Sequence, residues 1–196
     1  MTPTSIRLLT IGAAFLAGLL AFTVAILFVT GRSPVPQPSA IGGPFQLVDQ
    51  DGKPVTEAAL KGKPSLIFFG FTHCPDICPT ALFDISQVYK AMGKDGDRVA
   101  AYFVSVDPER DTPEILKEYL SSFDPRVRGL TGDPAAVAAM EQAYRVYSKK
   151  IPLEAGGYTM DHTALVYLMD KEGRFVAPFN MKRKPEDAAA ELRRYL

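Results

Sequence analysis

Residues 64–79 have the sequence PSLIFFGFTHCPDICP, and this stretch decides the fold. Its first half, Pro64 to Phe71, is an unbroken apolar run of the kind that forms a fully buried β-strand. Its second half, Gly70 to Pro79, holds both cysteines of the chain and one of its two histidines. Proline is tolerated in the first turn of a helix, so Pro79 predicts a helix start. We therefore expect both thiols at a strand-to-helix junction, where the helix dipole favours a thiolate.

Alternating strand and helix patterns surround this junction. Residues 79–92 carry apolar side chains at the 3-4 spacing of an amphipathic helix, which ends at Gly93. Two later helix starts combine a capping residue with proline, at Thr112-Pro113 and Asp133-Pro134. Residues 158–163 are predicted to be a loop. The predicted strands are 45–48, 54–56, 64–71, 98–106, 127–130, 163–169 and 175–179, and the predicted helices are 79–92, 113–123, 134–145 and 185–196.

The order of these elements indicates the fold class. After an opening hairpin, strands and helices alternate, and a closing strand hairpin and a last helix follow. This order argues for a central mixed sheet covered on both faces. We therefore predict an α/β protein with a thioredoxin-like central mixed sheet flanked by helices, formed by residues 44–196.

A separate apolar segment precedes this domain. Residues 8–29 carry no charge, and as a helix they would span about 33 Å, enough for a bilayer core. This core is longer than that of a cleaved signal peptide, and Val29-Thr30-Gly31 is a poor cleavage site. We predict that residues 1–30 form a membrane anchor with one N-terminal transmembrane helix. A Pro/Gly-rich linker over 31–43 then leads to a domain outside the cytoplasm. A cleaved signal peptide is the alternative.

The composition excludes two classes of protein. Twenty-two basic residues balance 22 acidic ones, and no run of five like charges occurs, which argues against a nucleic-acid partner. Two cysteines are too few for a disulfide-rich secreted scaffold. A pair of cysteines in an otherwise cysteine-free chain instead indicates a functional site.

Cys74 and Cys78 have the spacing of a chelating or redox-active pair. If Cys78 lies in the first helical turn, both sulfurs can face one side. Cα atoms at this spacing are about 5 to 6 Å apart, which suits either a disulfide or the chelation of one metal ion. A purely structural disulfide is disfavoured, because closing so small a loop removes little chain entropy.

Two histidines are candidates to join the pair. His73 directly precedes Cys74 and is expected to point away from the shared face. His162 precedes the predicted strand 163–169, and in a thioredoxin-like sheet the chain before that strand packs against the cysteine turn. A lone histidine is more often a hydrogen-bonded loop residue, but this position favours His162 as a ligand.

Two thiolates and one imidazole form a soft donor set that suits copper, as Cu⁺ or Cu²⁺. Structural zinc would need a fourth ligand from His73, Asp161 or water, so zinc is the weaker choice. Because the ligands come from separate segments, the metal ion could be passed on by ligand exchange.

Three motifs resemble the Sco/SenC family of copper chaperones for cytochrome c oxidase assembly. They are GFTHCPDICP at 70–79, SVDPERDTPEIL at 105–116 and DHT at 161–163, within a resemblance that covers about residues 44–196. An N-terminal anchor and a Pro-rich linker, like those of the family, are also expected here. The resemblance implies a thioredoxin-like fold, with copper held by Cys74, Cys78 and His162.

The resemblance also implies a location and a partner. The domain would face the periplasm in a bacterium or the intermembrane space in a mitochondrion. The partner would be cytochrome c oxidase subunit II, whose dinuclear copper (CuA) site these proteins fill or whose cysteines they keep reduced. Other copper chaperones and thioredoxin-like reductants are further candidate partners. Asp107, Pro108 and Asp111 match the second motif, either as part of the site or as a helix-start loop. Asp76 is a candidate for tuning metal affinity or partner contact.

We therefore predict a membrane-anchored copper-binding protein that delivers copper to the CuA site or prepares its thiols. The alternative is a thiol-disulfide oxidoreductase in which Cys74 and Cys78 are the redox-active pair. A disulfide cannot bind copper through its sulfurs, so the two activities would be coupled. A peroxidase is less favoured, because a peroxidatic cysteine needs a nearby Arg and Thr, and only Thr72 is local.

Overall fold

The computed structural model describes residues 14–26 and 40–196, which belong to two separate units, Met1–Pro38 and Ser39–Leu196. The described part of the first unit is a helix over residues 14–26 with exposed side chains. Within the described residues, no helix is both long and apolar enough to cross a membrane. The rest of the predicted span over residues 8–29, and most of the predicted linker over 31–43, lie outside the described residues.

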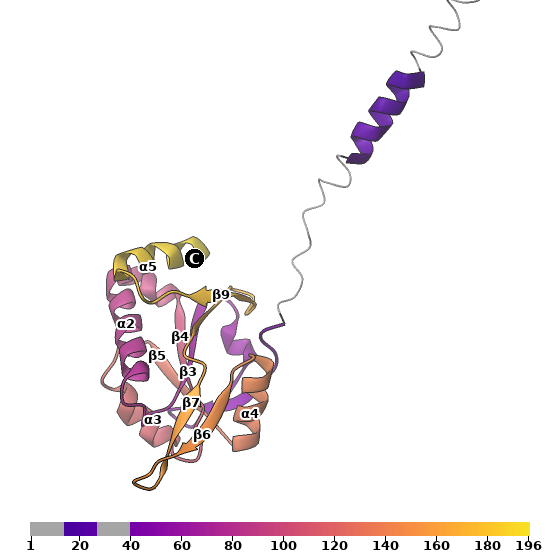
Figure 1. The fold of residues 1–196 in the computed structure, drawn as a ribbon. Helices are drawn as coiled ribbons and strands as arrows, with labels where there is room; N and C mark the ends of the chain where they lie inside the picture. Colours follow the sequence, from indigo (N-terminus) through magenta and orange to yellow (C-terminus); the bar gives the residue numbers. More distant parts are fainter. Residues whose placement is uncertain (1–13, 27–39) are drawn as a thin grey trace, which may run out of the picture. The chain divides into compact units, whose positions relative to one another are not determined.

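A mixed seven-stranded sheet forms the centre of the second unit (Figure 1). Its strands are β1 (Gln46–Asp49), β2 (Pro54–Thr56), β3 (Ser65–Gly70), β4 (Ala100–Ser105), β5 (Val127–Thr131), β8 (Val166–Met169) and β9 (Phe175–Phe179). The order across the sheet is β2-β1-β5-β4-β3-β8-β9. The strand pairs β3/β4 and β4/β5 are parallel, and all other neighbours are antiparallel. The predicted thioredoxin-like mixed sheet is confirmed.

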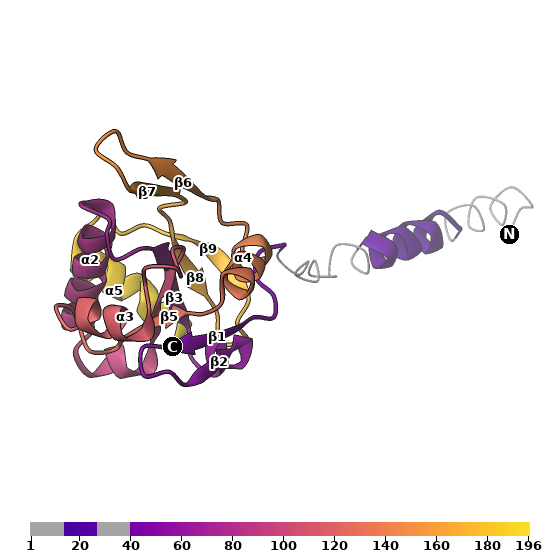
Figure 2. The same cartoon turned by 90° about the horizontal axis from the view of Figure 1, so that it is seen from below.

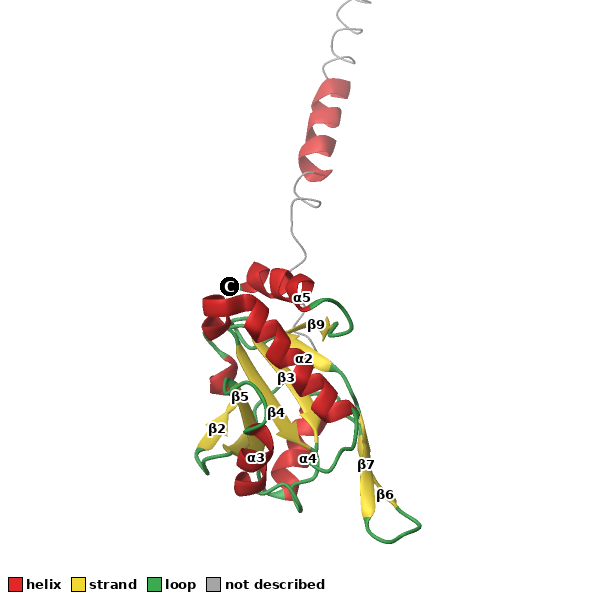
Figure 3. Cartoon of the chain, turned by 90° about the vertical axis from the view of Figure 1, so that its left-hand side faces the viewer, coloured by secondary structure: helices red, strands yellow, loops and turns green. Residues whose placement is uncertain are grey.

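Helices cover both faces of this sheet. Figures 2 and 3 show α2 (Ile77–Met92) and α3 (Pro113–Leu120) on one face and α4 (Pro134–Ala143) on the other, with α5 (Pro185–Leu192) beside α2. The central strand β3 is buried along its whole length, as expected of a strand covered on both sides. Three short 3-10 helices were not predicted from the sequence: Glu57–Leu60, Gly93–Arg98 and Arg193–Tyr195.

The predicted helix starts at Pro113 and Pro134 are confirmed. Helices α3 and α4 begin at Pro113 and Pro134, and the Thr112 hydroxyl accepts a hydrogen bond from the Ile115 N–H. Helix α2 begins at Ile77, two residues earlier than predicted, so Pro79 occupies its first turn. Helices α3 and α4 end earlier than predicted, at Leu120 and Ala143. Cys78 is thereby placed inside the first turn of α2.

A second, two-stranded sheet projects from the body of the domain (Figure 2). It is the hairpin of β6 (Ser148–Pro152) and β7 (Tyr158–His162), which turns through two glycines with positive φ, Gly156 and Gly157. The prediction of a loop over 158–163 was therefore wrong, as was the early start of the next strand, which begins at Val166. The physical reason is that Met160 is the one buried residue of the two strands, so little buried apolar face marks them in the sequence.

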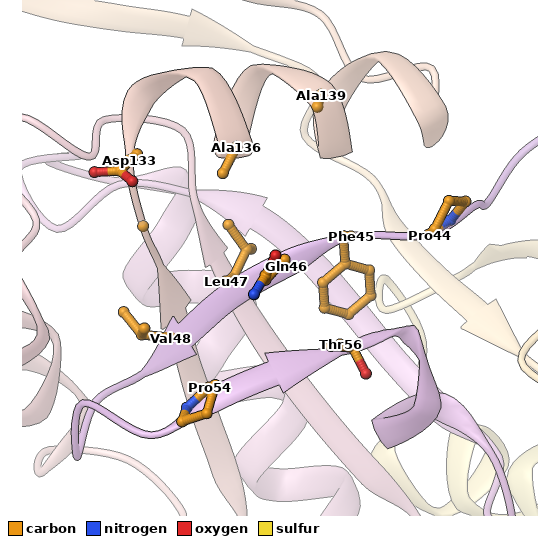
Figure 4. Close-up of a pocket in the computed structure, with 11 residues that line it drawn as sticks. Pro44, Phe45, Gln46, Leu47, Val48, Pro54, Thr56, Asp133, Ala136 and Ala139 are labelled. Carbon is orange, nitrogen blue, oxygen red and sulfur yellow. The ribbon is translucent and has the colours of Figure 1, made fainter.

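A broad hollow of about 830 Å³ lies between α4 and the β1–β2 hairpin (Figure 4). Apolar and small side chains line it, including Phe45, Leu47 and Ala136, with the Asp133 carboxylate at one end. Neither cysteine and neither histidine lines this hollow. The chemistry of the chain therefore lies elsewhere, at the junction of β3 and α2.

Candidate metal centre

The fold brings Cys74, Cys78 and His162 together. One ligand atom from each residue, both Sγ atoms and a ring nitrogen, lies within 4.8 Å of the other two. The distance from Cys78 Sγ to His162 Nε2 is 3.6 Å. Within the described residues, these side chains form the one group of three or more His, Cys, Asp or Glu close enough to hold a metal ion. The fold places Cys78 beside His162 although 84 residues separate them in the sequence.

The cysteine half of the site is fixed by the end of β3 and the start of α2. Both cysteines are free thiols, Cys78 is fully buried, and Cys74 is 9% exposed. The backbone N–H of Cys78 donates to Cys74 Sγ across 3.4 Å. A Cβ atom at Gly70 would lie 2.8 Å from Cys78 Sγ and 2.7 Å from Phe103 Cε2. Only glycine fits at this position, because any side chain would displace the Cys78 sulfur or the Phe103 ring.

Burial dominates the acidity of the Cys78 thiol. Desolvation raises its pKa well above the ordinary value, and a hydrogen bond from the Phe71 backbone offsets only part of this effect. The expectation that the helix start favours a thiolate is therefore wrong for Cys78 in the metal-free protein. Because thiolates are the metal-binding form, metal binding at this residue must displace a proton.

The histidine half of the site lies at the end of β7. A backbone carbonyl can only accept, so His162 Nδ1–H donates to the Thr163 carbonyl, at 3.1 Å. This contact leaves the lone pair of Nε2 directed toward Cys78 Sγ. Phe68 and Phe71 pack edge-on against the imidazole, with ring centroids 6.2 and 5.7 Å away. Burial lowers the His162 pKa, so the ring is neutral at neutral pH and able to bind a metal ion.

The second sequence motif anchors the cysteine half. Asp111 is fully buried and accepts three hydrogen bonds. They come from the Thr72 N–H at 3.0 Å, the Thr72 hydroxyl at 2.7 Å and the Ser105 hydroxyl at 2.6 Å. Thr72 is two residues before Cys74, so this carboxylate holds the start of the cysteine loop. Of the two roles expected for Asp111, these contacts support a part in the site over a helix-start loop alone.

The same motif also holds the histidine hairpin. Asp107 is buried, accepts a hydrogen bond from the Tyr158 hydroxyl at 2.8 Å and forms an ion pair with Arg110. Arg110 donates to the Tyr158 carbonyl at 3.0 Å and stacks on the Tyr158 ring, 3.9 Å from its centroid. Tyr158 is the first residue of β7 and His162 is the last. We call residues 107–111 the bracing loop, because it contacts both halves of the site.

The contacts of Arg110 and Tyr158 were not predicted from the sequence. Residues at alternate positions of a strand share a face, so a prediction of β7 would have placed Tyr158, Met160 and His162 on one side. The other candidates lie outside the three-ligand group. His73 Nδ1 lies 3.1 Å from the Thr72 hydroxyl and 3.9 Å from Asp111. The Asp76 side chain caps no backbone N–H of α2 and accepts a hydrogen bond from the Thr80 hydroxyl at 3.5 Å.

The mouth of the site is a hollow of about 260 Å³. Cys74, His162, Met160 and the exposed Asp76 and Asp161 are among its lining residues, whereas Cys78 is not. A molecule that approaches the site therefore meets Cys74 and His162 first. Chemically, the arrangement can hold a soft metal ion between two thiolates and an imidazole, or it can close the two thiols into a disulfide.

Comparison with known proteins gives consistent matches. Residues 33–196 match the family model described as SCO1/SenC. The Arabidopsis thaliana protein "Protein SCO1 homolog 1, mitochondrial" is 46% identical over 139 residues, 70% of this chain and 42% of that protein. The chain also spans only 46% of the yeast protein "Protein SCO2, mitochondrial", so it matches less than half the length of these two relatives.

Solved structures extend the comparison to copper-bound proteins. Bradyrhizobium japonicum ScoI with copper bound has a TM-score of 0.78 at 68% identity, covering 80% of this chain and 99% of that chain. Arabidopsis thaliana ScoI with copper bound has a TM-score of 0.72 at 40% identity, covering 79% of this chain and 98% of that chain. The prediction of copper as the metal is confirmed by these relatives together with the Cys–Cys–His cluster found here.

Proposed function

The chain belongs to the SCO1/SenC family, and we propose that it binds copper through Cys74, Cys78 and His162 for the assembly of cytochrome c oxidase. The observation that carries the proposal is the convergence of two buried sulfurs and one oriented imidazole nitrogen within 4.8 Å. Two thiolates hold Cu⁺, and the added imidazole lets the site accept Cu²⁺ as well. Asp161 and Asp76 remain outside the ligand set.

We propose that copper leaves by ligand exchange with the CuA site of oxidase subunit II. Cys74 and His162 line the mouth whereas Cys78 does not, so a thiolate of the partner can replace His162 first and Cys74 next. Cys78 releases the ion last and takes up a proton, in keeping with its raised pKa. Residues 1–30 are proposed to anchor the domain to the inner membrane, facing the periplasm or, in a mitochondrion, the intermembrane space. Residues 31–43 would then be the linker and 44–196 the copper-binding domain.

Copper titration of the reduced protein tests the ligand set. Wild-type protein is expected to bind one copper ion per chain, and Cys74→Ala, Cys78→Ala and His162→Ala are each expected to weaken binding strongly. His73→Ala is the matched control, because His73 neighbours Cys74 but lies outside the ligand group. Full stoichiometric binding by all three ligand variants would refute the proposal.

A second candidate function is thiol-disulfide exchange, favoured by two free, neighbouring thiols with Cys74 at the mouth. In this reaction Cys74 Sγ attacks a disulfide of the partner, and Cys78 Sγ then attacks the mixed disulfide. Two electrons and two protons pass to the partner, which gains two thiols while Cys74 and Cys78 form a disulfide. His162→Ala should keep this activity, and either cysteine variant should lose it. Loss of the thiol-disulfide exchange activity in His162→Ala would contradict this second function, in which the two thiols act without the histidine.

A further inference from the structure

Two large apolar side chains beside the metal centre are exposed to solvent. Ile77 is 44% exposed and Leu165 is 47% exposed. Ile77 lies between the two cysteines in the sequence, and Leu165 follows His162 by three positions. Each half of the metal centre therefore carries an exposed apolar residue close to its ligand. Exposed apolar residues are common singly, but a contiguous group of them next to a reactive site marks an interaction surface.

Ile77 and Leu165 line one hollow of about 360 Å³, which we call the apolar groove. Its walls come from the first turns of α2 and from the segments around β8 and β9. The residues that line it include Phe68, Ala81, Val166, Phe179 and Met181. The groove adjoins the mouth of the metal centre, because Ile77 and Ala164 line both hollows.

One carboxylate in the groove has no partner. Asp84 lies on α2, is partly buried and lines the groove. Burial raises its pKa, and no hydrogen bond or ion pair to Asp84 is present among the described residues. Lys182, which follows β9, also lines the groove but forms no ion pair with Asp84. A half-buried carboxylate of this kind is stabilised by a hydrogen-bond donor supplied from outside.

We propose that the apolar groove docks the copper-accepting partner, through an apolar segment of oxidase subunit II that adjoins its own copper-binding cysteines and brings an Arg or Lys side chain to Asp84. This inference rests on the proposed function. Ligand exchange requires a partner sulfur within bonding distance of copper at the mouth. The partner surface beside that sulfur must then contact the surface of this domain next to the mouth. On the side of Ile77 and Leu165, that surface is the apolar groove.

The test measures copper transfer from the full-length, copper-loaded chain to the soluble, metal-free CuA domain of subunit II. Transfer is followed over a range of acceptor concentrations, which separates docking from the exchange step. Leu165→Ser should raise the acceptor concentration for half-maximal rate about tenfold, the effect of removing one well-packed interface residue. Asp84→Asn should raise it by a smaller factor. The maximal rate and the copper stoichiometry should stay near wild type.

Matched controls lie outside the groove. Phe83 lies on α2 beside Asp84 and is 56% exposed, but it does not line the groove, and Val176 on β9 is likewise exposed outside it. Phe83→Ser and Val176→Ser should transfer copper like wild type. Equal effects in the control and groove variants would overturn the docking proposal.

The remaining outcomes separate this inference from the proposed function. Wild-type transfer with unchanged kinetics in Leu165→Ser and Asp84→Asn overturns the docking site alone. Absence of transfer from copper-loaded wild-type protein overturns copper delivery, and the docking inference with it. If Leu165→Ser instead converts a dimer of this chain to a monomer in sedimentation, the groove binds a second copy, and the proposal is wrong.

Discussion

The two halves of the metal centre are built in different ways. The cysteine half ends a central strand that is buried along its whole length, and Cys78 is itself fully buried. The histidine half ends a hairpin outside the main sheet, most of whose residues are exposed or only partly buried. Exposed elements with few buried contacts open locally at low free energy, whereas core strands open only with the whole domain. The site therefore combines fixed sulfurs with a histidine that can be released, which is what ligand exchange needs.

The bracing loop joins these unequal halves. Asp111 holds Thr72 on the cysteine side, and Asp107 with Arg110 holds Tyr158 on the histidine side. Asp111 and Ser105 in the first set are fully buried, whereas Arg110 and Tyr158 in the second set are only partly buried. Disruption of the first set should therefore destabilise the fold, and disruption of the second should act mainly on the position of His162.

The largest effect is expected from Asp111→Asn. An amide keeps one acceptor oxygen but directs an NH₂ group at donors, so buried groups of Thr72 and Ser105 lose their partner. Leaving such groups unsatisfied should lower the free energy of unfolding by about 3 kcal/mol. Chemical denaturation of the purified protein measures this change. Asp133→Asn is the control, because the exposed Asp133 accepts no capping hydrogen bond; equal losses in both variants would contradict the role of Asp111.

The next effect is expected from Gly70→Ala, again in the cysteine half. The added methyl group would overlap Cys78 Sγ and the Phe103 ring, so overpacking should cost about 2 kcal/mol. Copper affinity should fall as well, because the sulfur moves. Adding Phe103→Leu removes the ring atoms but leaves the overlap with Cys78 Sγ. The double variant should therefore regain stability without regaining copper affinity, and recovery of both would show that the sulfur is free to adjust.

The contrast between the cysteine half and the histidine half also explains how much of the structure the sequence could predict. The apolar run of β3, the caps at Thr112-Pro113 and the spacing of Cys74 and Cys78 are local signals, and the elements built on them are confirmed. In the hairpin of β6 and β7 only Met160 is buried, so its strands leave too weak an alternating pattern to detect. The contacts of Tyr158 with Arg110 and Asp107 span 48 and 51 residues. Such contacts depend on the finished fold, which is why the bracing role of this motif was not predicted.

Tyr158→Phe should act on the histidine half with a smaller effect. The variant removes the hydrogen bond to Asp107, which as a bond to a charged group contributes about 1.5 kcal/mol. Because the hairpin can open by itself, this loss should appear as roughly tenfold weaker copper binding, with a smaller change in global unfolding. Copper competition assays measure the change in affinity. Amide hydrogen exchange along β7 should become faster, because the hairpin opens more often. In a His162→Ala background the substitution should have no further effect on copper binding; an additive loss would mean that Tyr158 acts on the cysteines.

The smallest effect is expected from Lys150→Ala, which removes a second cation from the same Tyr158 ring. Lys150 Nζ lies 4.7 Å from the ring centroid and pairs with Glu109, but both charged side chains are largely exposed. Exposed ion pairs are screened by water and salt and contribute little. Copper affinity should therefore match wild type at low and at high ionic strength. If Lys150→Ala weakened copper binding as much as Tyr158→Phe, the exposed ion pair rather than Asp107 and Arg110 would hold the hairpin, and wild-type affinity would then fall as salt is added.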